Sequence, residues 1–151
     1  SMSLPALHSI YFSPSVFCNL KCRHCWLNPP YSKERKELPE DLTLVEIFQV
    51  MKEALTLGLK TVKITGGEPF IRRDILEILK GVHDLKISLQ LETNGILLDQ
   101  EAAMVLEKIY REDKAFFLSL SLDGDENLHD YQRGVQGAYQ AVLKAMKERK
   151  R

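Results

Sequence analysis

The sequence predicts an α/β fold in which parallel strands alternate with helices. Short runs rich in β-branched and aromatic residues alternate four times with longer stretches in which apolar residues recur at helical spacing. Glycine, asparagine or aspartate follows three of the four β-prone runs. Elements that alternate in this way form a parallel sheet with crossover helices, and the carboxyl ends of the strands meet at one edge of that sheet.

The expected elements are placed by their boundary residues. The first strand covers residues 8–13, and we expect its Tyr11 to lie in the core. Thr43 and Glu46 have the spacing of a capping box that opens a helix, and Gly58 ends that helix. The other expected elements are a strand over 61–65, a helix carrying Ile71, Ile75, Ile78, Leu79 and Val82, a strand over 86–93, a helix over 99–110, a strand over 115–122 and a helix from Gly137.

The composition is that of one globular domain of 151 residues with 44% apolar residues. Lysine plus arginine equals aspartate plus glutamate at 21 each, so we expect no nucleic-acid or membrane partner. Reduced cysteines and the lack of an export pattern predict a cytoplasmic protein. A residue precedes Met2, so we expect residues 1–9 to be an N-terminal tail that includes a cloning remnant, and residues 10–151 to be the core domain.

All three cysteines, Cys18, Cys22 and Cys25, lie within eight residues. Thiolates this close in sequence usually hold a metal or a cluster. Structural zinc sites are closed by four ligands, and iron–sulfur clusters commonly take four cysteines, so three cysteines leave one metal position open. His24 offers a fourth zinc ligand only awkwardly, because adjacent side chains rarely point the same way. The alternatives at this point are an enzyme and a non-catalytic iron–sulfur or zinc module.

Three further motifs follow the second, third and fourth expected strands. They are Gly66-Gly67-Glu68-Pro69, Thr93-Asn94-Gly95, and Ser119-Leu120-Ser121-Leu122-Asp123-Gly124 with His129-Asp130-Tyr131-Gln132-Arg133-Gly134. We expect them to converge with the cysteine loop at the carboxyl edge of the sheet. Glycines let the backbone approach a ligand closely, although a tight turn also explains each glycine pair taken alone.

With these motifs in this order, the sequence resembles the radical S-adenosylmethionine (SAM) enzymes. The block after the fourth strand is similar to the SPASM/twitch-type branch, which includes peptide- and protein-modifying maturases. The resemblance implies that Cys18, Cys22 and Cys25 bind three irons of a 4Fe–4S cluster and that SAM chelates the fourth. It also implies an oxidoreductase or maturase that reductively cleaves SAM to a 5′-deoxyadenosyl radical for hydrogen abstraction.

The resemblance further assigns residues to SAM. His24 occupies an aromatic position that packs near the adenine. Gly66, Gly67 and Glu68 are expected to contact the amino group of the methionine part, through backbone carbonyls and the Glu68 position.

Asn94 is expected to reach the ribose or the methionine part of SAM. Ser121 is expected to donate or accept a hydrogen bond to SAM, and Arg133 to pair with its carboxylate, which a planar guanidinium matches in bidentate fashion. Asp123 and His129 are expected to brace their loop.

The resemblance implies a partial, incomplete TIM-like barrel of six βα units, of which this sequence supplies four. We therefore expect a core truncated after the fourth unit, inactive alone, and self-association through the apolar edge of the fourth strand. The implied partners are SAM, a reductant such as flavodoxin or ferredoxin, and a peptide, protein or cofactor-precursor substrate.

Overall fold

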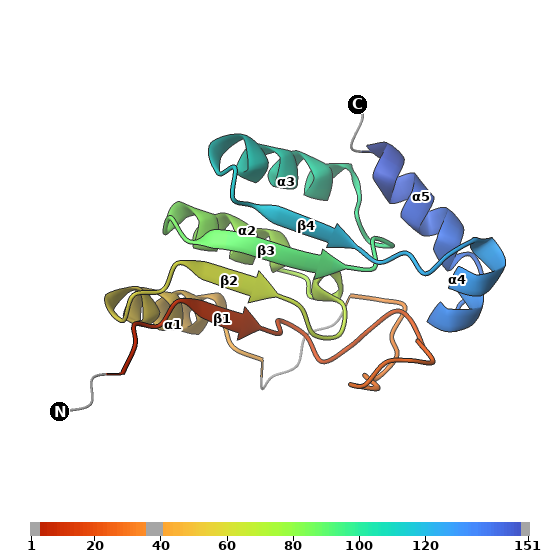
Figure 1. Ribbon diagram of the computed structural model, residues 1–151, viewed down its shortest axis with the longest axis horizontal. Helices are drawn as coiled ribbons and strands as arrows, with labels where there is room; N and C mark the ends of the chain where they lie inside the picture. The colour runs from red at the N-terminus through yellow and green to blue at the C-terminus, as the bar shows by residue number, and fades with distance from the viewer. Residues whose placement is uncertain (1–3, 36–40, 149–151) are drawn as a thin grey trace.

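The computed structural model of the protein describes residues 4–35 and 41–148. Its centre is one sheet of four parallel strands, β1 (Ser9–Phe12), β2 (Thr61–Ile64), β3 (Ser88–Thr93) and β4 (Phe117–Leu120). The strands lie side by side in chain order, β1-β2-β3-β4 (Figure 1). Because all four run in the same direction, their carboxyl ends reach the same edge of the sheet. The predicted parallel α/β fold is confirmed.

Three helices cover one face of this sheet (Figure 1). They are α1 (Leu44–Thr56), α2 (Ile75–Asp84) and α3 (Gln100–Glu112), and a short 3₁₀ helix, η1 (Pro69–Ile71), precedes α2. Two more helices, α4 (Glu126–Arg133) and α5 (Ala138–Glu148), lie beyond the carboxyl end of β4 and pack on each other. None of the helices in the described ranges is long and apolar enough to cross a bilayer.

The core lies between the sheet and the three helices α1, α2 and α3. Val62, Ile64, Leu89 and Leu91 are at most 1% exposed and pack against the apolar sides of α1, α2 and α3. Side chains of a strand alternate between the two faces, so the residues between them point to the other face. That face carries no helix in the part of the chain that the structure describes. Within the described ranges this face is therefore open.

Tyr11 is the clearest correction to the predicted core, because it is 73% exposed on this open face. Its ring lies 5.4 Å from the Lys63 Nζ. Lys63 in turn pairs with Glu92 at 2.6 Å, and Thr65 Oγ1 donates to the same carboxylate at 2.9 Å. The open face thus carries a polar network across β1, β2 and β3.

The helix boundaries show why some elements were predictable. Thr43 Oγ1 accepts a hydrogen bond from Glu46 N, and Glu46 Oε2 accepts one from Thr43 N at 2.8 Å, so the predicted capping box is present. Asp99 caps α3 by accepting from Ala102 N at 2.9 Å. Ile71, in contrast, lies in η1 rather than in α2.

Helix α4 is a difference from the sequence prediction, which places its residues in a loop. Asp125 accepts from Leu128 N to cap the start of α4, and Gly134 ends it with a φ of 66°. Asp130 of α4 also accepts from Gly137 N at 2.7 Å and Tyr139 N at 2.8 Å. These hydrogen bonds to the start of α5 lower the pKa of Asp130 and fix the two helices to each other.

Candidate functional site

The cysteine loop leaves β1 at the carboxyl edge of the sheet, where the other three motifs also end. Asn94 Nδ2 donates to Asn19 Oδ1 at 2.7 Å and lies 3.9 Å from the Cys18 Sγ. Glu68 N donates to Phe17 O at 2.8 Å. A third motif, after β4, reaches the loop through the side chain of Arg133. The predicted convergence of the four segments is therefore found.

The first half of the loop is held by residues 30–32. Cys18 N donates to Pro30 O at 3.0 Å, and Ser32 N donates to Cys18 O at 2.9 Å. The Lys21 Nζ lies 4.4 Å from the centre of the Tyr31 ring. These contacts fix the backbone on both sides of Cys18, which is 7% exposed.

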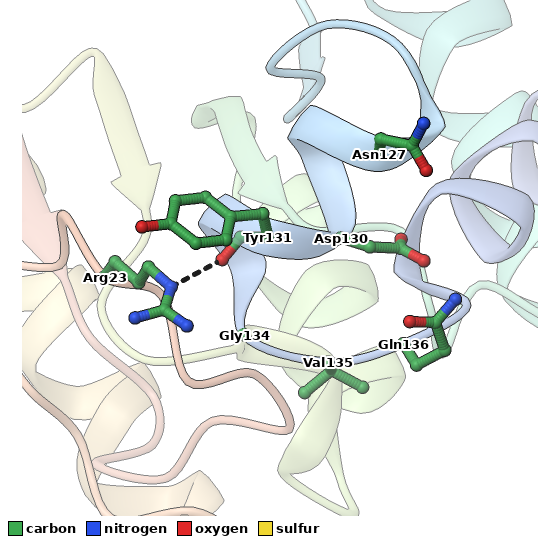
Figure 2. Close-up of a pocket in the computed structure, with 7 residues that line it drawn as sticks. All are labelled: Arg23, Asn127, Asp130, Tyr131, Gly134, Val135 and Gln136. Carbon is green, nitrogen blue, oxygen red and sulfur yellow. Dashed lines mark hydrogen bonds between the residues drawn. The ribbon is translucent and has the colours of Figure 1, made fainter.

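The second half of the loop is held by the end of α4. Lys21 N donates to Arg133 O at 2.9 Å, and Arg23 N donates to Gln132 O at 2.8 Å. The Arg23 guanidinium lies 4.2 Å from the centre of the Tyr131 ring, and its Nε donates to Tyr131 O at 3.0 Å (Figure 2). The cysteine loop is therefore clamped between two backbone segments, residues 30–32, which follow it closely in sequence, and the end of α4, which is more than 100 residues away.

A cavity of about 360 Å³ opens beside this second clamp (Figure 2). Arg23 is the residue that the cysteine loop contributes to it, and the rest of the lining comes from α4 and the loop that follows. The lining residues are Arg23, Asn127, Asp130, Tyr131, Gly134, Val135 and Gln136. The Asp130 carboxylate in this lining is bonded to the start of α5, at Gly137 N and Tyr139 N.

The three cysteines are free thiols. Burial raises the pKa of Cys18 to about 11, so this thiol holds its proton at neutral pH until a metal displaces it. Burial also raises the pKa of Cys22, whereas the neighbouring Arg133 guanidinium lowers it. Within the described ranges, no three Cys, His, Asp or Glu side chains are arranged as ligands of a single metal ion. His24 is exposed and does not complete a ligand set with the cysteines.

This donor set fits an iron–sulfur cluster. Thiolates are the ligands that such clusters take, and all three thiols belong to one loop that its neighbours hold in place. Three protein ligands leave one position for an exogenous group.

Glu68 is 1% exposed and is bonded entirely within the protein. Its carboxylate accepts from Phe70 N at 3.1 Å, from Thr93 Oγ1 at 2.6 Å and from Asn94 N at 2.9 Å. Burial raises the pKa of Glu68, and these three hydrogen bonds act in the opposite direction. The side chain joins the end of β2 to the end of β3, and its carboxylate is occupied by these protein donors. The contact of this motif with SAM stays a prediction, and the backbone is the part of the motif that could make it.

Gly66 and Gly67 allow the cysteine loop to pass directly over the end of β2. A Cβ on Gly67 would lie 2.1 Å from Phe17 O, closer than any real contact. Gly66 has a φ of 113°, and a Cβ there would meet the Ser13 side chain at 1.8 Å. The glycine pair thus serves the approach of two protein segments, a role that the sequence did not disclose.

Asn94 is 7% exposed, and both ends of its amide are bonded. Its Oδ1 accepts from Ile96 N at 3.1 Å, and its Nδ2 donates to Asn19. Asn94 therefore links the turn after β3 to the Asn19 side chain, next to Cys18. Asn19 was missed by the sequence analysis, because an asparagine between two cysteines carries no signal of its own. Ser121 is partly exposed, and its hydroxyl makes no hydrogen bond within residues 4–35 and 41–148.

Asp123, His129 and Arg133 form one bonded group. Arg133 donates from Nε and Nη2 to the two carboxylate oxygens of Asp123 at 2.7 and 2.9 Å, and from Nη1 to Cys22 Sγ at 3.7 Å. His129 Nδ1 accepts from Asp123 N at 3.1 Å. The role predicted for Asp123 and His129, bracing the loop, fits these contacts.

The fold and site together define a cofactor-binding α/β protein with a thiol loop at the carboxyl edge of a parallel sheet. Residues 12–151 match the model of the Radical SAM superfamily, and the chain belongs to that family. Members of this superfamily use a 4Fe–4S cluster together with SAM.

Two curated relatives illustrate the range of activities. The chain is 33% identical over 139 residues to a GTP 3′,8-cyclase of Campylobacter curvus, covering 84% of this chain and 41% of that protein. It is 29% identical over 130 residues to an Fe-coproporphyrin III synthase of Methanosarcina barkeri, covering 85% of this chain and 30% of that protein. The chain thus spans less than half the length of either relative.

Among solved structures, SuiB of Streptococcus suis bound to S-adenosylmethionine superposes with a TM-score of 0.69 at 29% identity, over 94% of this chain and 29% of SuiB. SuiB bound to its precursor peptide SuiA gives a TM-score of 0.72 at 27% identity, over 94% of this chain and 30% of that one. These structures support the partial TIM-barrel core.

Proposed function

We propose that the chain is the cluster- and SAM-binding part of a radical SAM oxidoreductase or maturase. The observation that carries this proposal is the convergence of three free thiols in one clamped loop with the Gly66, Asn94 and Asp123 segments. When the cofactors are bound, they supply reductive cleavage of SAM to a 5′-deoxyadenosyl radical, which abstracts hydrogen from a substrate.

The thiolates of Cys18, Cys22 and Cys25 would hold the cluster, and the clamps on both halves of the loop set their positions. Ser121, just after β4, has a hydroxyl that bonds to no described residue and is proposed to bind SAM. Arg133 donates three of its five N–H groups to described residues, and the other two are proposed to bind the SAM carboxylate. The backbone of Gly66 and Gly67 is proposed to receive the amino group, and the exposed His24 to pack near the adenine.

The substrate is proposed to be a peptide, a protein or a cofactor precursor. Relatives with names from both classes support this range, since SuiB was crystallised with a precursor peptide and the Methanosarcina protein is named for a porphyrin product. The open face of the sheet, with Tyr11, Lys63 and Glu92, is the surface we propose for it. An electron donor such as flavodoxin or ferredoxin is the proposed reductant, in the cytoplasm.

The test is anaerobic reconstitution with iron and sulfide, followed by EPR of the reduced protein with and without SAM. The proposal expects a 4Fe–4S signal that changes when SAM is added. The matched control is Cys18→Ser, Cys22→Ser and Cys25→Ser combined, which should give no cluster signal.

The alternative function is a non-catalytic iron–sulfur or zinc module. It predicts a cluster signal that is indifferent to SAM, or stable zinc in place of iron. Stable zinc, or a cluster signal that stays indifferent to SAM in a chain extended by two βα units as well, would overturn the SAM-binding role.

A further inference from the structure

Arg133 is the one cation that contacts a cysteine sulfur among the described residues. Its Nη1 donates to Cys22 Sγ at 3.7 Å, which is within hydrogen-bonding range for sulfur. The guanidinium side chain is 12% exposed, so water competes little for this bond. The positive charge and the N–H donor are therefore both presented to one specific sulfur of the three.

The position of this guanidinium is set from two directions. On the other side of the guanidinium, the Asp123 carboxylate accepts two hydrogen bonds from Arg133, at 2.7 and 2.9 Å. Asp123 is fixed in turn, because its backbone N–H donates to Nδ1 of His129, which is 1% exposed. A planar guanidinium held by a bidentate carboxylate has a defined orientation, so the N–H that points to Cys22 is pre-organised.

The side chain of Arg133 is separable from the docking of the loop. The loop is attached to α4 through the backbone, where Arg133 O accepts from Lys21 N and Gln132 O accepts from Arg23 N. Substitution of the Arg133 side chain therefore leaves these backbone bonds in place. This makes the contact with sulfur testable by mutation.

We propose that Arg133 is a positioning residue that tunes the cluster through Cys22, with Asp123 and His129 holding it in place. Hydrogen bonds to the cysteine sulfurs and nearby charge set the reduction potentials of iron–sulfur clusters. An N–H donor and a positive charge at the Cys22 sulfur stabilise the reduced cluster, which carries one more electron, and so make its potential less negative. The inference rests on the proposed cluster site.

The experiment is an EPR-monitored redox titration of the reconstituted 151-residue protein without SAM. Arg133→Met removes the charge and the donor at similar volume, and Arg133→Lys keeps the charge but loses the planar fork. The matched control is Arg111→Met, which removes the same charge from an exposed position on α3. We expect a shift to more negative potential in Arg133→Met, a smaller shift in Arg133→Lys and none in Arg111→Met.

A second measurement does not need a folded variant. Resonance Raman of the wild-type cluster should show Fe–S(Cys) stretching bands that shift after exchange into D₂O, because the N–H···S bonds from Arg133 to Cys22 and from Asn94 to Cys18 become N–D···S. The shift should be smaller in Arg133→Met, where the Asn94 bond remains. Equal potentials in wild type and Arg133→Met, or bands that do not respond to D₂O, would overturn the tuning role while leaving the cluster site intact. Failure of the wild-type chain to incorporate iron would overturn the cluster site itself, and the inference with it.

Discussion

Thr93 donates a hydrogen bond of 2.6 Å from its hydroxyl to the buried carboxylate of Glu68, across the ends of two neighbouring strands. The hydroxyl oxygen of Thr93 also accepts a hydrogen bond from Gly95 N at 3.1 Å. The end of β2 and the turn after β3 are therefore joined through one hydroxyl and one carboxylate. The cysteine loop rests on both segments, so this contact lies beneath the proposed cluster site.

Replacement of Thr93 by valine is expected to destabilise the protein. The change keeps the shape but leaves Glu68 one donor short and Gly95 N without an acceptor. A buried polar group left unpaired costs about 1–3 kcal/mol. Urea unfolding measures the loss, and Thr56→Val serves as control, because the Thr56 hydroxyl is exposed and should cost under about 0.5 kcal/mol. Equal effects of the two variants would contradict the structural role of Thr93.

Replacement of Gly67 by alanine tests the close approach of the cysteine loop. A methyl group there would lie 2.1 Å from Phe17 O, so the loop must move away from β2. Gly137→Ala is the matched variant, because Gly137 has a φ of 85° but open space around it, and left-handed backbone costs an alanine about 1–2 kcal/mol.

We expect Gly67→Ala to unfold at clearly lower urea concentration than Gly137→Ala and to take up less iron on reconstitution. Iron uptake equal to wild type in Gly67→Ala would show that the loop position is not set by this contact.

His129 predicts a pH dependence of stability. Burial lowers the pKa of His129 below its ordinary value of 6.5, and Arg133 lowers it further, against the opposing charges of Asp123 and Asp130. Below 6.5 the unfolded chain therefore binds a proton that the folded chain does not. The contribution of His129 to the free energy of unfolding is therefore fully present above pH 6.5 and is lost as the pH is lowered from that value towards the lower pKa of the folded protein.

The matched variant is His129→Asn, in which the amide oxygen can still accept from Asp123 N. The difference in the pH slope between the two proteins isolates His129, because carboxyl groups such as Glu68 titrate in both. Urea unfolding between about pH 5 and 7.5 measures it, in the range around the ordinary histidine pKa. Identical slopes would show that His129 keeps its ordinary pKa in the folded protein.

The edge of the sheet at β4 predicts self-association of the chain. Phe117 is 60% exposed and Leu122 is 47% exposed, next to a strand that has a partner on one side. An unpaired apolar edge is a template for another chain, and a charged residue on it discourages pairing. We expect the mass measured by light scattering to rise with concentration, and Phe117→Lys to reduce that rise. A monomeric mass at all concentrations would contradict the prediction.

The sequence predicted the four parallel strands and the edge where the site lies, because periodicity and turn residues are local signals. Helix α4 has no helical pattern of apolar residues by which to predict it, because seven of its eight residues are polar or aromatic and Leu128 is its sole aliphatic residue. The cap at Asp125 and the glycine at Gly134 were the signals that could have found it.

The roles of Glu68 and Tyr11 could not be predicted locally. The carboxylate of Glu68 is bonded to residues 25 and 26 positions away, which no spacing within the motif reveals. Tyr11 follows a strand pattern that fits a core position if both faces of the sheet are covered. Only the placement of all three helices on one face shows that Tyr11 is exposed.

The contacts between α4 and the second half of the cysteine loop have a consequence for the order in which the chain folds and takes up iron. Arg133 lies 111 residues after Cys22, and the backbone bonds between the loop and α4 span a similar separation. During synthesis from the N-terminus, the cysteine loop emerges together with residues 30–32, which hold its first half, but long before α4, which holds its second half. We therefore expect Cys22 to stay accessible to oxygen and to stray metal until the fourth βα unit has folded.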